Sequence, residues 1–390
     1  MQVLKEKHVN FILSKLTHFG RIITLSLFLL SYSFTHAQKE VDPMLEFAKQ
    51  QVAQEAYYAA ISTLDSYLSY NKNDTSALYW KAHCFYKLKN FIAAEDNYRT
   101  LLKISPRNFA GNVDMANMYI LQKKYKDALP YYNTALSING IDASIVNSRG
   151  MCYYYNEKFE LAIKDFKQVI KLDPTNYKAY NNLGSATYNN QNIANASKVD
   201  LITAEELFSK AVEIKPDFPL SYRNRGVVRY YLEKNDEAYK DLMKTILLDP
   251  KDENAQYYLG KLLYRQKKYP KAIQFYDNAI SLASDRPEIY IDRGVCYLDM
   301  KNIEEARNDF FKAFQLGQDK GYAAYQLART YGAESMKNNA FNYLRDAKKY
   351  GLFNDINNFS VLASDKYFEE WAKDKDFYEL VQELKFGKKK

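Results

Sequence analysis

Histidine, cysteine and acidic side chains carry most of the acid–base, nucleophilic and metal chemistry of proteins, so their positions limit what a chain can do. The chain has four histidines, and three of them, His8, His18 and His36, lie within its first 37 residues. Only His83 lies beyond that segment. With only one histidine outside this segment, we do not expect a His-based metal site or a Ser-His-Asp triad.

The acidic pairs and the glycines also give little sign of catalysis. Glu205–Glu206 and Glu304–Glu305 fall where helices are expected to begin, and carboxylates there are favoured by the helix dipole alone. No glycine-rich loop of the phosphate-binding type occurs. The sequence therefore predicts a protein that is not an enzyme, with no catalytic residues, no metal site and no cofactor.

Small residues recur along the chain with a fixed period. One series steps by 34 residues, with a single gap of 42 after Gly184: Ala48, Ala82, Ala116, Gly150, Gly184, Gly226, Gly260, Gly294 and Ala328. A second series has the same steps: Ala60, Ala94, Ala128, Ala162, Ala204, Ala238, Ala272, Ala306 and Ala340. Self-similarity at this period is the signature of a solenoid. Apolar residues within each period recur at helical spacing, which predicts two short helices per repeat.

This pattern resembles the tetratricopeptide repeat family, whose aromatic, Leu-Gly, Tyr, Ala, aromatic and Pro positions spread over 34 residues. Tyr180, Leu183 and Gly184 match it, as do Gly260, Tyr269, Ala272, Tyr276 and Ala279. The resemblance implies an all-α, right-handed superhelical solenoid of about nine helix-turn-helix repeats. It is specific for the fold and says little about function.

The two series also set the expected boundaries. Repeats are predicted over residues 41–74, 75–108, 109–142, 143–176, 177–218, 219–252, 253–286, 287–320 and 321–354, within an array of 38–354. The fifth repeat carries eight extra residues in or near 189–200, which are either a second binding surface or a tolerated insertion. Residues 355–390 place Phe368, Trp371, Phe377, Leu380 and Leu384 at helical spacing, which predicts a C-terminal helical cap.

The three cysteines follow the repeat. Cys84, Cys152 and Cys296 each lie two residues after a small position, on the expected packed side of a first helix. They belong to repeats too far apart for a disulfide, which needs Cα atoms within about 7 Å. We expect three buried thiols.

The residue before each small position alternates between apolar and basic. Where it is arginine, the residue sixteen positions later is aspartate. We infer structural ion pairs within alternate repeats: Arg149–Asp165, Arg225–Asp241 and Arg293–Asp309. A relic of duplication of a two-repeat ancestor is an alternative reading of the same alternation.

By the resemblance, the first helices of the repeats line a concave face. Its central stretch would carry a peptide-binding groove of Asn147, Tyr154, Lys178, Asn181, Asn182, Tyr188, Arg223, Asn224, Tyr231, Tyr257, Tyr258, Lys261, Tyr264 and Arg265. No acidic residue stands at the inward positions of this stretch, so we expect a neutral-to-basic strip. Asparagine can pair with a peptide backbone, tyrosine gives rigid contact area, and Lys or Arg favours an acidic segment or a free carboxylate. Tyrosine is abundant, with 36 copies, so an ordinary solvated face is the alternative.

The first 37 residues have the layout of a secretory signal peptide. Four basic residues precede the apolar run IITLSLFLLSYSF, and Thr35, His36 and Ala37 follow it. We expect cleavage after Ala37; the competing reading is a membrane anchor, although the run is short of the roughly 20 residues that a span needs.

These features together predict a non-catalytic scaffold of the bacterial periplasm or cell envelope, in a Gram-negative organism. Its partner would be another protein or peptide, and the net charge of +8 is too mild for a nucleic-acid signature. The mature chain would have no transmembrane segment. A carbohydrate-handling envelope component with the same Tyr- and Asn-rich groove is the alternative.

Overall fold

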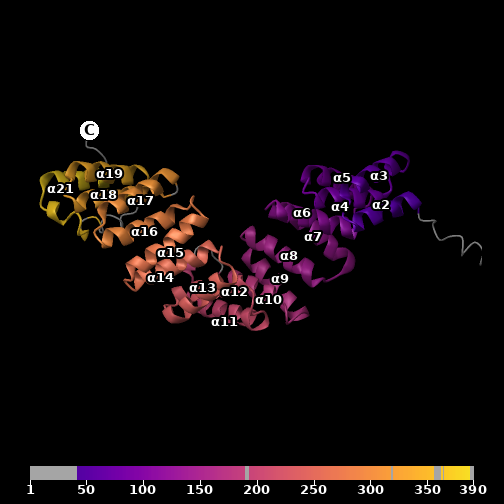
Figure 1. Cartoon of the computed structure of the whole chain (residues 1–390), viewed down its shortest axis with the longest axis horizontal. Coiled ribbons are helices and arrows are strands. Elements are labelled where there is room, and N and C mark those ends of the chain that lie inside the picture. The colour runs from indigo at the N-terminus through magenta and orange to yellow at the C-terminus, as the bar shows by residue number, and fades with distance from the viewer. Residues whose placement is uncertain (1–41, 189–192, 318, 355–361, 363, 387–390) are drawn as a thin grey trace, which may run out of the picture. The chain divides into compact units, whose positions relative to one another are not determined.

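The computed structural model describes residues 42–188, 193–317, 319–354, 362 and 364–386. The predicted signal peptide, residues 1–37, lies outside the described residues. The described part is all-α: helices follow one another in pairs joined by short turns, and it contains no strand (Figure 1). This confirms the all-α fold of paired helices. The chain divides into two compact units, residues 1–140 and 141–390.

The N-terminal unit contains three helix pairs. They are α2 (Pro43–Ala53) with α3 (Tyr57–Tyr70), α4 (Thr75–Lys87) with α5 (Phe91–Ile104), and α6 (Phe109–Leu121) with α7 (Tyr125–Asn139).

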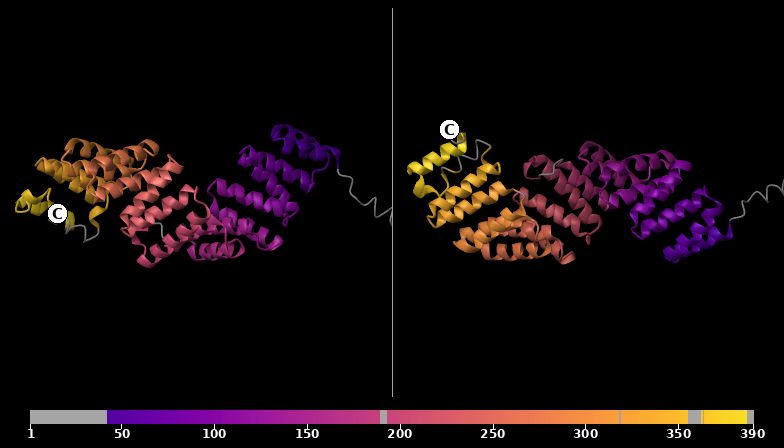
Figure 2. Two further views of the ribbon diagram at one scale, coloured as in Figure 1. Left: turned by 60° about the horizontal axis from the view of Figure 1, so that its bottom comes forward. Right: turned by 90° about the horizontal axis from the view of Figure 1, so that it is seen from above.

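The C-terminal unit continues the same arrangement, and its neighbouring helices lie side by side in all views (Figure 2). Its pairs are α8 (Ala143–Tyr155) with α9 (Phe159–Leu172), α10 (Tyr177–Thr187) with α11 (Lys198–Ile214), α12 (Pro219–Tyr231) with α13 (Asn235–Leu248), α14 (Glu253–Arg265) with α15 (Tyr269–Leu282), α16 (Pro287–Asp299) with α17 (Ile303–Leu316), and α18 (Lys320–Ala333) with α19 (Lys337–Lys349). The described part of this unit also contains the short helices η1 (Ile193–Asn195), η2 (Leu352–Asn354) and η3 (Glu369–Trp371) and the helix α21 (Lys375–Phe386).

Side-chain caps start many of the first helices. Asp74 accepts a hydrogen bond from the backbone N–H of Ala77 at 2.9 Å, and Asp252 accepts one from that of Ala255 at the same distance. These oxygens satisfy N–H groups that have no partner within the helix, which fixes where the helix begins.

In every hairpin except that of α10 and α11, which carries the insertion, the turn between the two helices holds one residue in the left-handed conformation. The positive φ angles recur at Glu55, Lys89, Lys123, Glu157, Glu233, Lys267, Lys301 and Ser335. Apart from the interval that spans the insertion, they repeat with the step of the small residues. One backbone geometry therefore turns the chain in each of these hairpins.

The small positions let the two helices of a hairpin approach closely. A Cβ atom built at Gly260 would lie 2.5 Å from the Tyr276 ring, and one at Gly150 would lie 2.7 Å from the Phe166 ring. A larger side chain at such a position would overpack the hairpin, which typically costs about 1–3 kcal/mol. At the glycines, the periodic small residue is thus explained by a large partner on the second helix, which is an aromatic ring for Gly150, Gly184, Gly260 and Gly294 and Leu242 for Gly226.

The insertion is partly built into the core. Ile193 and Ala196 pack with Leu201, Phe208 and neighbouring side chains, and α11 has 17 residues where α13 has 14. Residues 189–192 of the insertion lie outside the described part.

The C-terminal residues cover the last hairpin. Phe368, Trp371, Phe377, Leu380 and Leu384 are buried in one cluster with side chains of α18 and α19. Gly332 permits this contact, because a Cβ there would lie 2.4 Å from the carbonyl oxygen of Tyr367. Within the described residues, no helix is long and apolar enough to cross a membrane.

Candidate functional site

Six of the predicted groove residues line one pocket in the C-terminal unit. This central pocket has a volume of about 500 Å³ and lies on the first helices α8, α10, α12 and α14. Its lining comprises Met151, Tyr154, Tyr155, Phe166, Asn181, Asn182, Ser185, Tyr188, Leu220, Arg223, Asn224 and Asn254. The volume lies within the range of about 300–1,000 Å³ that is usual for ligand pockets.

Amide side chains link neighbouring first helices across this pocket. Asn182 on α10 donates to Asn147 on α8 at 3.2 Å, and Asn224 on α12 donates to Asn181 on α10 at 3.1 Å. Asn181 also accepts a hydrogen bond from Ser221 at 3.3 Å. The asparagines thus form a polar ladder that runs from helix to helix.

Arg223 is paired with a carboxylate from outside the predicted strip. Its guanidinium lies 3.1 Å from Asp252, which is buried, and it donates a longer bond of 3.4 Å to Asn224. Asp252 ends the loop before α14 and caps that helix as well. Arg223 therefore adds no net charge to the expected neutral-to-basic strip, because a carboxylate at the end of the same predicted repeat, 219–252, offsets it.

Lys261 has a similar partner. Its ammonium lies 3.6 Å from the carboxylate of Asp292 on α16, and Tyr257 donates to the same carboxylate at 2.8 Å. Burial raises the pKa of Asp292, and Lys261 and Tyr257 act in the opposite direction. Lys261, Tyr264, Arg265 and Asp292 line a smaller cavity of about 260 Å³.

Tyrosine rings occupy the space between these polar groups. Tyr231 and Tyr258 approach each other at 3.5 Å through their hydroxyls, and Tyr154 and Tyr155 meet edge to face. Burial raises the pKa of Tyr154, Tyr188 and Tyr258, so these phenols stay neutral at ordinary pH. They offer hydrogen bonds and ring faces but no charge.

The remaining groove residues differ in exposure. Tyr257 is buried, and Lys178 and Arg265 are exposed. The Arg265 guanidinium lies 3.9 Å from the centre of the Tyr230 ring and donates to the Tyr230 carbonyl at 3.0 Å. Lys178 stands on α10 but is not among the residues that line the central pocket.

The structure places each inferred arginine–aspartate pair in direct contact. Each pair has two hydrogen bonds: 2.8 and 2.7 Å for Arg149–Asp165, 2.8 Å twice for Arg225–Asp241, and 2.8 and 2.6 Å for Arg293–Asp309. All three aspartates are buried. Parallel bonds to buried carboxylates fix the spacing of the two helices, which is a structural role.

The three cysteines lie in the hydrophobic core as free thiols. Cys84, Cys152 and Cys296 are buried and free. Burial raises the pKa of Cys84 to about 11 and the pKa of the other two to about 12. The thiolate is the reactive form, so these groups are poor nucleophiles at neutral pH.

His83 belongs to a polar cluster in the N-terminal unit. The carboxylate of Asp114 lies 2.8 Å from its Nδ1 and accepts hydrogen bonds from Tyr79 at 3.0 Å and Tyr98 at 3.1 Å. These contacts join α4, α5 and α6. Among the described residues, no group of three or more His, Cys, Asp or Glu side chains could hold a metal ion.

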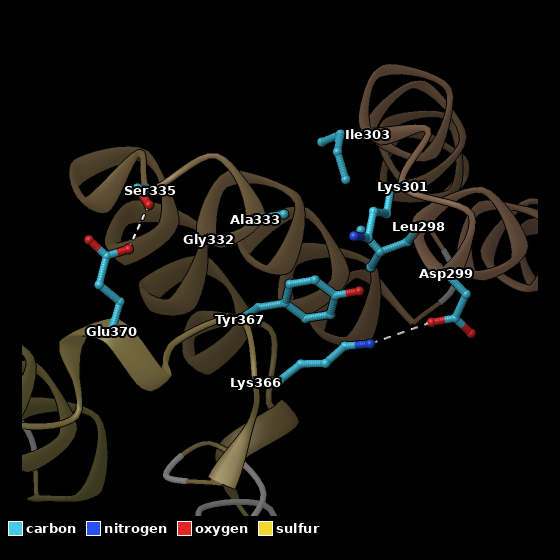
Figure 3. Close-up of a pocket in the computed structure, with 10 residues that line it drawn as sticks. All are labelled: Leu298, Asp299, Lys301, Ile303, Gly332, Ala333, Ser335, Lys366, Tyr367 and Glu370. Carbon is cyan, nitrogen blue, oxygen red and sulfur yellow. Dashed lines mark hydrogen bonds and ion pairs between the residues drawn. The ribbon is translucent and has the colours of Figure 1, made fainter.

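Figure 3 shows a further cavity, of about 510 Å³, beside the cap. Lys366 reaches toward Asp299 at 3.8 Å, and Ser335 donates to Glu370 at 2.6 Å. Tyr367 projects between them. These contacts join the cap to the hairpins before it. We therefore interpret the cavity as a structural feature of the junction between the cap and the repeats.

Sequence reasoning missed the carboxylate partners of Arg223 and Lys261 and the apolar residues that line the central pocket. Asp252 lies at the end of the repeat that contains Arg223, and Asp292 lies in the repeat after that of Lys261. On the sequence pattern, Met151, Phe166 and Leu220 are interpreted only as core residues. One signal was present: polar residues 35 apart recur at Tyr79–Asp114, Asn147–Asn182, Tyr257–Asp292 and Tyr264–Asp299, and each pair is hydrogen-bonded.

The chain is similar to parts of several larger proteins. The chain is 26% identical over 254 residues to Hsp70-Hsp90 organizing protein 1 of Glycine max, which covers 64% of this chain and 42% of that protein. It is 24% identical over 297 residues to a DnaJ homolog subfamily C member 7 homolog of Dictyostelium discoideum, covering 72% and 54%. The chain thus spans about half the length of these relatives.

A solved structure shares the fold. A tetratricopeptide repeat protein from Parabacteroides merdae superposes with a TM-score of 0.52 at 20% identity, covering 66% of this chain and 98% of that one. The family model for the anaphase-promoting complex, cyclosome, subunit 3 matches residues 230–313. The model for the tetratricopeptide repeat matches residues 75–108 and 143–176. The paired helices and the matched segments therefore show tetratricopeptide repeats in this chain, at residues 75–108 and 143–176.

Proposed function

We propose that the protein is a non-catalytic scaffold that holds an extended segment of another protein on the first helices α8, α10, α12 and α14. The observation that carries this proposal is the central pocket, where asparagine amides and neutral tyrosines from successive helices face one space. Side-chain amides offer both a donor and an acceptor, as a peptide backbone requires. The name of the Glycine max relative, an organizing protein for two others, agrees with a role in holding proteins together.

The proposed location is the periplasm or cell envelope of a Gram-negative bacterium. It rests on the signal-peptide layout of residues 1–37. Expression of the full chain in such a host, followed by fractionation and N-terminal sequencing, tests it. A mature chain that begins at Gln38 in the periplasmic fraction supports export, and an intact cytosolic chain contradicts it.

Binding is tested by crosslinking and capture from envelope fractions. The double variant Asn182→Ala, Asn224→Ala removes two amides that line the central pocket. The matched control is Asn338→Ala, Asn342→Ala, which removes two amides that line a cavity at α19 and α21. A protein captured by the wild type and the control, and lost only in the first variant, supports the proposal. Equal capture by all three forms places the binding site elsewhere.

A second function is favoured by the tyrosines of the central pocket. Tyr154, Tyr155 and Tyr188 could stack on sugar rings while the amides bond to hydroxyls. This carbohydrate-handling role predicts that capture is competed by cell-wall or capsule fragments. If peptides, acidic or neutral, compete with the captured partner and polysaccharide fragments do not, the result supports the scaffold function.

A further inference from the structure

Asn181 is a buried polar residue whose side chain is only partly satisfied within the described structure. It is 2% exposed. Its Oδ1 accepts hydrogen bonds from Ser221 and Asn224, at 3.3 and 3.1 Å. Arg223 donates to Asn224 Oδ1, so the network directs Asn224 Nδ2 toward Asn181. Among the described residues, no hydrogen bond from Asn181 Nδ2 occurs, and the residue lines the central pocket. This donor belongs to a residue that lines the pocket, so it is available to an acceptor that a ligand brings.

Asn182, the next residue, supplies the complementary group. Its Nδ2 donates to Asn147, and its Oδ1 accepts no hydrogen bond from the described residues. Both residues line the same pocket. Together they offer one donor and one acceptor, the pair that an amide group needs.

The charge of the pocket selects against an ionic ligand. Among the described residues that line it, Arg223 is the only charged one, and Asp252 neutralises it at 3.1 Å. A charged side chain entering this space would lose hydration without gaining a free counter-charge. The expectation of an acidic ligand therefore does not extend to this pocket.

Apolar and aromatic side chains also line the pocket. Met151, Phe166 and Leu220 are among them, together with Tyr154 and Tyr188. Phe166 is itself buried and lies against Gly150, so this part of the lining belongs to the hairpin core. Ring faces and apolar side chains beside the amides favour an uncharged aromatic side chain over a charged one.

We infer that the central pocket binds one residue of a partner segment, an uncharged aromatic residue. Its ring would contact the apolar and tyrosine side chains of the lining, and its backbone amide would bond to Asn181 and Asn182. This rests on the proposed function and specifies its ligand. The segment would bind through this anchor, and salt would weaken binding little, because no net charge is neutralised.

The test uses small probes on the full chain. Ligand-observed NMR compares N-acetyl-tyrosine methylamide with N-acetyl-aspartate methylamide and with methyl N-acetylglucosaminide, which carries an amide on a sugar. We expect the tyrosine probe to bind more than roughly tenfold better than the aspartate probe. Equal or stronger binding of the aspartate probe overturns the inference. Preference for the sugar overturns it in favour of a carbohydrate site.

A pocket-filling variant assigns the site. Ser185→Trp places a large side chain in the central pocket, and Ser281→Trp places the same side chain on the exposed face of α15 as a control. We expect the tyrosine probe to lose binding in the first variant and keep it in the second, with both variants melting like the wild type. If Ser185→Trp melts early, Asn182→Ala replaces it, with an expected loss of roughly tenfold in probe affinity.

The two proposals can fail separately. If the partner capture described above depends on Asn182 and Asn224 but no probe binds, the scaffold function stands and the aromatic anchor is wrong. If the tyrosine probe binds in the central pocket but no protein is captured through it, the pocket is real and the scaffold function is wrong.

Discussion

At the residue scale, buried arginine–aspartate pairs hold the two helices of a hairpin in register. Asp165 is 3% exposed and accepts two hydrogen bonds from Arg149. Its negative charge is removed from water, so it depends on the guanidinium beside it. Arg99 and Glu95 form a pair of the same charge types at the surface, where the Arg99 side chain is 60% exposed. The two pairs should therefore differ in what they contribute to stability.

We expect Arg149→Met to lower the free energy of unfolding by about 3–5 kcal/mol, because it leaves Asp165 buried without its partner. Arg99→Met should cost about 0–1 kcal/mol. Urea denaturation followed by circular dichroism measures both. The double variant Arg149→Met, Asp165→Leu should recover much of the loss, since it removes the stranded charge. Equal effects of the two single changes would show that Asp165 is not stabilised by Arg149.

The same scale shows what the sequence could predict. The ion pairs were predictable because both partners lie in one repeat, sixteen residues apart, and alternate together. The partner of Arg223 was not predictable in this way. Asp252 is the cap of α14, and a capping residue is normally assigned to its own helix. Side chains that serve two elements at once give no periodic signal.

At the element scale, the hairpins turn through a left-handed residue that is not glycine. Lys267 has φ 57° and follows α14, and Lys301 has φ 65° and follows α16. A residue with a Cβ pays roughly 1–2 kcal/mol in this conformation, and glycine avoids most of that cost. The small residues placed the hairpins but gave no information on these turns, because seven of the eight turn residues are lysine or glutamate, which do not favour turns.

We expect Lys267→Gly to raise the free energy of unfolding by about 0.5–1 kcal/mol. Glycine relieves the backbone strain of the turn, and this gain is partly offset because glycine also increases the conformational entropy of the unfolded chain. The control is Lys271→Gly, four residues on and inside α15, which should lower stability by about 1 kcal/mol. Both lysines are exposed, so side-chain packing contributes little to either change. Thermal or urea unfolding gives the sign. A loss of stability at Lys267 would mean that its side chain contributes more than the turn costs.

At the scale of the whole molecule, the repeats determine both the fold and how it unfolds. Within each unit, neighbouring hairpins pack on one another, so stability is the sum of many local contacts and need not be shared along the chain. The chain forms two compact units, residues 1–140 and 141–390, and each contains one of its two tryptophans. Trp80 packs against Tyr79 on α4, and Trp371, which belongs to the cap, is buried against Phe341 of α19. Each indole can therefore report on its own unit.

We expect the two units to unfold at different urea concentrations, because cooperativity weakens with distance along an array of repeats. In Trp80→Phe the fluorescence follows Trp371 and the cap, and in Trp371→Phe it follows Trp80 near the N-terminal end. The circular dichroism transitions of both variants must overlay that of the wild type, which shows that neither change disturbed the array. Distinct fluorescence midpoints would then demonstrate separate unfolding. Coincident midpoints, equal to the circular dichroism midpoint, would instead show that the hairpins couple strongly enough for the array to unfold as one.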